Sequence, residues 1–165
     1  MSRLTTIELH KESMKFSAGH FTILSKTKRE RLHGHNFSVH AIISAMLHDD
    51  TGMTFDYREY KNKLQHLCHQ LNESFLIPSQ SPFARIESDD KHYFIHFNEE
   101  IIPFLKSDIT LLALKNITVE ELSLWFIEQL LKDNASCEAY DIQEITIKVF
   151  TGPGQSGAST WKKNP

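Results

Sequence analysis

Two histidines, His33 and His35, are separated by a single residue in a segment that is typical of a β-strand. Side chains two residues apart on a strand leave the sheet on the same face, so both imidazoles are expected to project together. His20 ends the preceding strand-like segment, and pairing of the two strands would bring it alongside. Three neutral imidazoles with one open position form a usual catalytic zinc site, in which the metal acts as a Lewis acid. Spacing alone also fits an incidental pair of surface histidines, and this alternative stays open.

The strands that would carry these histidines are predicted from side-chain periodicity. Residues 5–20 are typical of a first strand. One face of this strand would present Met14, Phe16, Ala18 and His20. Residues 32–47 predict a second, longer strand that pairs with the first and points His40 away from the candidate ligands. The histidine trio is therefore expected where two adjoining strands meet.

Two helices are predicted from capping residues followed by apolar residues at helical spacing. Asp56, with an acidic residue three positions later, is expected to start a helix over 57–71. Thr118, with the same pattern, is expected to start a second helix over 119–131. Its apolar face would consist of Leu122, Trp125, Phe126 and Leu130.

The remaining elements are shorter. Within residues 74–116, the segment 92–97 predicts a strand and 109–114 an extended segment. Residues 145–150 predict another strand, followed by a Gly-rich turn and a closing strand at 158–161. The order is two strands, helix, inserted segment, helix and two strands. This order favours an α+β fold with both helices on one face of an antiparallel four-stranded sheet.

Length and composition narrow the class of protein. A chain of 165 residues suits one domain over 1–165. The net charge of −3 gives no basic footprint for nucleic acid, and no segment approaches the ~20 apolar residues of a membrane span. Without a signal-peptide pattern, Cys68 and Cys137 are expected to be reduced thiols in the cytoplasm.

Several motifs, in this order, resemble the 6-pyruvoyl- and 6-carboxy-tetrahydropterin synthase family. They are FSAGH at 16–20, LHGHNF at 32–37, GMTFDY at 52–57, NITVEEL at 116–122 and IKVF at 147–150. The resemblance implies the tunnelling fold, with an insertion at about 77–115. In that fold the sheets of several subunits close into a barrel, so it also implies a homo-oligomer, either a hexamer or another ring.

The same resemblance implies a site and a reaction. His20, His33 and His35 match the family's zinc ligands. The implied activity is that of a lyase, which removes triphosphate from a dihydroneopterin triphosphate-like pterin or cleaves its side chain.

The resemblance also implies a recognition site for the 2-amino, N3–H edge of the pterin. Glu120, after Thr118, matches the first of two family glutamates that bind this edge. Thr151 stands where the second is expected, and a hydroxyl there weakens a charge-assisted contact.

Three further positions depart from the family pattern. Arg29 stands where most relatives have a cysteine, and arginine stays protonated. Glu30, next to it, is a candidate replacement base, and a solvated charge in a basic loop is the alternative. Asn72 and Glu73 stand where an Asp-His pair is expected. Glu73 is a candidate proton relay, whereas Asn72 cannot titrate. These departures keep open a second hypothesis, a non-catalytic or repurposed zinc-binding member that takes a different purine- or pterin-like ligand.

Overall fold

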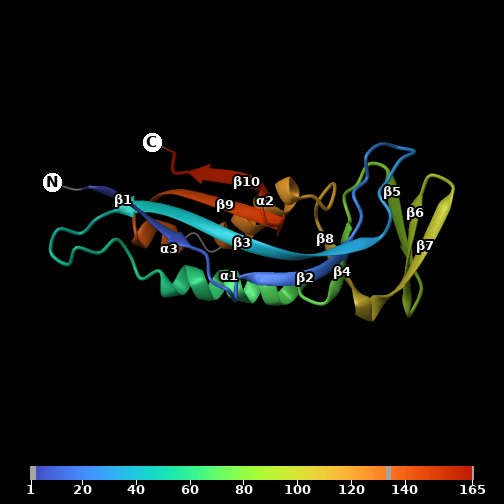
Figure 1. Ribbon diagram of the computed structural model, residues 1–165, viewed down its shortest axis with the longest axis horizontal. Coiled ribbons are helices and arrows are strands. Elements are labelled where there is room, and N and C mark those ends of the chain that lie inside the picture. Colours follow the sequence, from blue (N-terminus) through green and yellow to red (C-terminus); the bar gives the residue numbers. More distant parts are fainter. Residues whose placement is uncertain (1–2, 133–134, 165) are drawn as a thin grey trace.

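A long mixed β-sheet, covered by helices on one face, forms the body of the protein, and a small three-stranded sheet stands at one end (Figure 1). The computed structural model describes residues 3–132 and 135–164. In chain order the elements are β1 (Leu4–Leu9), β2 (Lys15–His20), β3 (His33–Met46), α1 (Arg58–Leu71), β4 (Ser74–Pro78), β5 (Ala84–Ser88), β6 (His92–Phe97), β7 (Glu100–Leu105), a 3-10 turn (Lys106–Asp108), β8 (Ile109–Leu112), α2 (Val119–Leu131), α3 (Ala135–Ala139), β9 (Ile142–Gly152) and β10 (Gln155–Lys162).

The predicted antiparallel strands form the path β10-β9-β3-β2, and further strands extend it. β4 and β8 continue the sheet beyond β2 as parallel strands, and β1 pairs with the far half of β3. In the described part of the chain the main sheet therefore has seven strands rather than four. The α+β class and the helix-covered face agree with the sequence prediction.

The single strand predicted over 5–20 is wrong, because the structure divides it into β1 and β2. Leu9 and Met14 are both buried, at 2% and 0% exposure. Their sequence positions have opposite parity, so one uninterrupted strand could not turn both toward the core. A turn between them, in which the Met14 N–H donates to the Lys11 carbonyl at 2.8 Å, restores the alternation. Both halves then pair with the same edge of β3.

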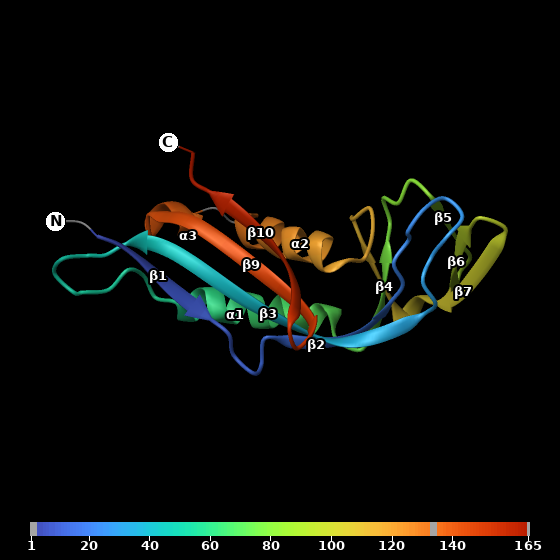
Figure 2. The same ribbon diagram turned by 45° about the horizontal axis from the view of Figure 1, so that its top comes forward.

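The core lies between the sheet and the helices α1 and α2; in Figure 2, α1 lies behind β3 and α2 lies next to β10. Phe16 of β2 stacks on Phe37 of β3 with ring centroids 4.9 Å apart, and Phe126 of α2 lies 6.1 Å from Phe16. All three are fully buried. Phe16 has the same parity as His20, and Phe37 the same parity as His35. The helix-covered face is therefore the face that carries these histidines.

The two predicted helix starts differ in their outcome. The Thr118 hydroxyl accepts the Glu121 N–H at 3.3 Å, so Thr118 is the N-cap of α2 as predicted. At α1 the N-cap is Tyr57, and the prediction for Asp56 is wrong. The Asp56 carboxylate accepts the N–H and guanidinium of Arg58 instead, because an aspartate bonds readily to the backbone two residues on.

Replacing Thr118 by alanine is expected to lower the free energy of unfolding by about 1 kcal/mol, because one N–H of the first turn of α2 loses its partner. Urea denaturation measures the change. Thr27→Ala, at an exposed loop position, is the matched control and is expected to leave the midpoint unchanged. Equal midpoints for both variants would contradict the capping role.

The small sheet β5-β6-β7 has its own hydrophobic cluster. Its strand β6 coincides with the strand predicted at 92–97, and β6 supplies the buried residues Ile95 and Phe97. Phe21 and Ile23, just after the end of β2, belong to the same cluster. The loop between β2 and β3 is therefore packed against this sheet.

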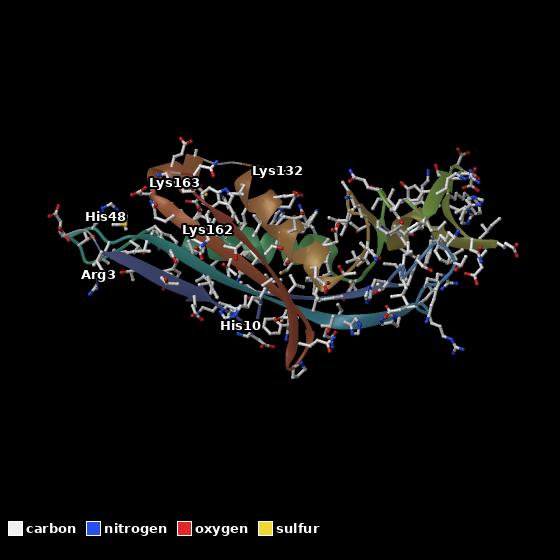
Figure 3. The ribbon with its side chains drawn as sticks, turned by 90° about the horizontal axis from the view of Figure 1, so that it is seen from above. Arg3, His10, His48, Lys132, Lys162 and Lys163 are labelled. Carbon is white, nitrogen blue, oxygen red and sulfur yellow. The ribbon has the colours of Figure 1, made fainter. Side chains whose placement is uncertain are left out.

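The lysines near the C-terminus lie far from the small sheet. Figure 3 shows Arg3, Lys162 and Lys163 at the opposite end of the molecule from β5–β7. Lys162 and Lys163 pair with Glu144 and Asp141 at 3.0 and 2.7 Å. No helix in the described ranges is long and apolar enough to cross a membrane.

Candidate metal centre

Three histidine rings converge where β2 ends and β3 begins. His20 pairs directly with His33 in the antiparallel register, and Ala18 pairs with His35. The centroid of the His20 ring lies 4.6 Å from that of His33 and 5.2 Å from that of His35. One nitrogen from each ring falls within 4.8 Å of the other two. The register thus produces the convergence that the sequence spacing indicates, and the group forms a potential metal site.

Backbone carbonyls orient two of the rings. His20 Nδ1 lies 2.9 Å from the Ile117 carbonyl and His33 Nδ1 lies 2.8 Å from the Arg31 carbonyl. Since a carbonyl oxygen only accepts, each Nδ1 carries the proton and each Nε2 keeps its lone pair. Fixing of the tautomer by a hydrogen bond at the other ring nitrogen is usual for metal-binding histidines.

One of the nitrogen atoms that face the centre, in the part of the chain that the structure describes, lacks the partner that burial requires. His20 Nε2 is buried without a hydrogen-bond partner, and among the described residues it is the only such side-chain atom. His33 Nε2 and His35 Nε2 lie 3.1 Å apart, so a proton or another cation must separate their lone pairs. Burial lowers the pKa of His20 and of His35, and both effects favour the neutral imidazole that binds metals. This donor set fits a divalent cation such as zinc.

Glu30 lies beside the cluster. Its Oε2 is 3.8 Å from His33 Nε2 and accepts the Thr22 N–H at 3.1 Å. Hydrogen bonds from the Thr22 hydroxyl and N–H lower the pKa of the Glu30 carboxyl. The carboxylate is thus anchored next to the histidines rather than free in the loop.

Glu73 lies in a different environment. It follows α1 with a left-handed backbone (φ 56°) and borders a hollow of ≈ 450 Å³ that is also lined by His35. Gly19 and Gly34, a directly opposed pair, line the same hollow. In the described part of the chain, the Glu73 carboxylate forms no hydrogen bond or ion pair. The structure therefore brings Glu30 into contact with the cluster, and it brings Glu73 only to a hollow that His35 shares.

The neighbouring Asn72 has a structural contact. Its side-chain oxygen accepts the Ser17 N–H at 2.8 Å. This bond ties the C-cap residue of α1 to β2. Asn72 therefore holds the strand that ends in His20.

The three candidate recognition residues lie around the start of α2 and the end of β9. The Thr118 hydroxyl is engaged by the helix, and Glu120 is exposed in the first turn. Gly157 of β10 packs so closely on this turn that a Cβ there would lie 2.7 Å from the Glu120 nitrogen. Thr151 is half-buried near the end of β9. Within the described residues no hydrogen bond joins the three side chains to one another.

Sequence reasoning missed Asn116. Its Oδ1 accepts the N–H groups of Ile23 and Ile117, each at 3.0 Å, and its Nδ2 donates to the Ile23 carbonyl at 2.8 Å. Asn116 thus connects the segment after His20 to the residue whose carbonyl orients His20. The only sequence signal was its place at the start of the NITVEEL motif.

Replacing Asn116 by leucine is expected to cost about 1–3 kcal/mol of unfolding free energy, because three partly buried backbone groups lose their partners. Metal affinity should also fall by about tenfold, as it does when residues that orient a metal ligand are replaced. Denaturant titration and competition with a chelating dye measure the two effects. Asn62→Leu, at an exposed position of α1, is the control, and identical behaviour of the two variants would refute the role of Asn116.

The fold and the site together define a class of protein. A helix-covered sheet with three converging histidines at the junction of two strands is characteristic of tunnelling-fold proteins with a metal site. A family model described as 6-pyruvoyl tetrahydropterin synthase matches residues 8–156. The chain therefore belongs to the 6-pyruvoyl tetrahydropterin synthase family, whose members are lyases.

Individual relatives agree with this membership. A Pyrococcus horikoshii protein, provisionally named 6-carboxy-5,6,7,8-tetrahydropterin synthase, is 24% identical over 92% of this chain and 88% of its own. The solved 6-pyruvoyl tetrahydropterin synthase of Plasmodium falciparum has a TM-score of 0.91 at 24% identity, with 97% of this chain and 99% of that chain covered. The Plasmodium vivax enzyme has the same TM-score at 23% identity, with 98% and 99% covered. Two further P. vivax structures carry replacements of a glutamate described as a catalytic residue.

Proposed function

We propose that this protein is a zinc-dependent lyase that acts on a dihydroneopterin triphosphate-like pterin. The observation that carries the proposal is the buried His20 Nε2, which has no hydrogen-bond partner among the described residues and lies within 4.8 Å of one nitrogen from each of the His33 and His35 rings. Family membership supports a tetrahydropterin synthase-like activity. Bound zinc would polarise the side-chain oxygens of the substrate.

Glu30 is the residue we assign to proton removal, since its carboxylate is already anchored beside the cluster. In carbon–oxygen cleavage, Glu30 takes a proton from the side-chain carbon, the electron pair forms a C=C bond, and triphosphate leaves. In carbon–carbon cleavage, Glu30 takes a hydroxyl proton, a carbonyl forms, and the carbon released from the broken bond is protonated. The catalytic glutamate of the P. vivax enzyme supports a carboxylate in this role. Glu73, which shares a hollow with His35, is our candidate for returning the proton.

Recognition of the pterin is assigned to Glu120, assisted by Thr118 and Thr151. A carboxylate accepts two donors from the 2-amino, N3–H edge, which is the stronger kind of hydrogen bond. Exposure of Glu120 at the start of α2 leaves it free to do so. We further propose that the chain acts as one domain in a closed ring of copies, a hexamer or another size, in the cytoplasm.

A second candidate function is a zinc-binding protein that holds a purine- or pterin-like ligand without converting it. The contact of Asn72 favours it, because this amide holds the backbone of β2 and cannot move a proton. The neutral Thr151 also weakens the expected recognition of a pterin.

Turnover of dihydroneopterin triphosphate, followed by mass spectrometry, separates these functions. Release of triphosphate identifies carbon–oxygen cleavage, and a shortened pterin side chain identifies carbon–carbon cleavage. Either product, lost in His33→Ala, supports the lyase. Binding without any product supports the second candidate, and the lyase proposal is then abandoned. Elemental analysis of unchelated protein should find near-stoichiometric zinc.

A further inference from the structure

Arg29 makes an unusual set of contacts for a residue in a surface loop. Its side chain is only 18% exposed, and its Nε and Nη2 donate to the same Glu100 oxygen at 2.8 and 2.6 Å. The guanidinium also lies over the Phe21 ring, 5.5 Å from the centroid. Arg29 therefore joins the loop before β3 to the first residue of β7.

The same guanidinium holds the main chain of the neighbouring residue. Arg29 Nη1 donates to the Glu30 carbonyl at 2.9 Å. An isolated β-bridge pairs Arg29 with Ile23, and the Glu30 N–H donates to the Thr22 carbonyl at 2.9 Å. Since the Glu30 carboxylate in turn accepts the Thr22 N–H, both ends of Glu30 are tied to the segment that follows His20.

Glu100, the partner of Arg29, is held in place by the small sheet. Glu100 pairs with Phe97 in the antiparallel register of β6 and β7. Phe97 is 2% exposed and packs in a cluster with Phe21, so the carboxylate of Glu100 starts from a fixed strand. Glu100 is half-exposed, and ion pairs in such settings add little to overall stability. The main effect of this pair is therefore expected on geometry rather than on the free energy of unfolding.

We propose that Arg29 is a positioning residue, which uses Glu100 of the small sheet to fix the Glu30 carboxylate beside the three histidines. The inference rests on the proposed role of Glu30 and deepens it. The sheet β5-β6-β7 then has a role in the site, because its residue Glu100 holds the loop between β2 and β3 in position. It also explains how a cation at position 29 contributes without moving protons itself.

The test uses Glu100→Gln and Arg29→Met in the full-length, zinc-loaded protein. Each is expected to lower kcat by roughly 10- to 100-fold, the size of effect that small misplacements of a catalytic group produce, while KM stays within about twofold. Arg29→Lys should recover part of the loss. The double variant should be no slower than the worse single variant, because the two residues act as a pair. Glu87→Gln, which removes ion pairs on the same sheet away from Glu30, is the control and should keep the original kcat.

A second measurement does not depend on activity. The Thr22 amide proton reports the hydrogen bond to Glu30. In Glu100→Gln and Arg29→Met its NMR resonance should move upfield and its protection from hydrogen exchange should decrease. Neither change is expected in Glu87→Gln. Unchanged kcat and an unchanged Thr22 amide in both variants would overturn the inference. If the original protein shows no turnover, the proposed function fails and the Thr22 amide alone decides the positioning role.

Discussion

Replacing His20 by alanine is expected to abolish stoichiometric zinc and, with it, turnover. His20 is the most buried ligand candidate, at 5% exposure, and its Nε2 has no hydrogen-bond partner within residues 3–132 and 135–164. Loss of a direct ligand should weaken zinc binding by more than the roughly 10- to 100-fold that follows from replacing a residue that only orients a ligand. Elemental analysis after desalting, and product formation by mass spectrometry, measure the two effects.

His40 offers a matched control for this experiment. It lies on β3, with parity opposite to that of His33 and His35, stacks on His10 and contacts Glu8 at 3.2 Å. His40→Ala should therefore retain zinc. A His20→Ala protein that kept one zinc per chain would show that the metal is held elsewhere, and the proposed site would have to be given up.

Replacing Glu30 by glutamine is expected to lower kcat by about 10²–10⁴-fold, the range for loss of a general base, while zinc and fold are retained. Glutamine has the same shape, and its amide oxygen can still accept the Thr22 N–H. The negative charge of the carboxylate is lost, and with it the capacity to take a proton. Steady-state kinetics, zinc content and thermal unfolding should be measured on the same preparation.

Glu73→Gln is the informative comparison for Glu30→Gln. Glu73 borders a hollow that His35 shares, but its carboxylate is not anchored at the cluster. We expect a smaller loss of kcat for Glu73→Gln than for Glu30→Gln. Full activity of Glu30→Gln would remove this residue from the mechanism, and a larger loss at Glu73 would transfer the role of base to Glu73.

Much of the site's framework could be predicted because it depends on local alternation. Strand parity alone places Met14, Phe16, Ala18 and His20 on one face, and all four are buried in the structure. Parity likewise places His33 and His35 together. The N-cap Thr118 is also a local signal, because its hydroxyl acts on a residue three positions away.

Features that join distant parts of the chain were not predictable in this way. The parallel pairing of β2 with β4, and of β4 with β8, depends on partners far apart in sequence. The bonds from Asn116 to Ile23, and from Arg29 to Glu100, cross 93 and 71 positions. Neither periodicity nor composition carries information about such pairs, since the same residues would be ordinary in a solvated loop.

The opposed glycines beside the cluster constrain how this protein can evolve. A methyl group at Gly19 would lie 2.3 Å from the Phe75 ring, and one at Gly34 would lie 3.0 Å from the Ala18 carbonyl. The first addition would displace the Phe75 ring, and the second would push β2 away from β3, the strands that set the spacing of the imidazoles. Substitutions that adapt the site to new ligands are therefore expected in the surrounding loops and in the sheet β5-β6-β7, whereas Gly19 and Gly34 are expected to remain glycine.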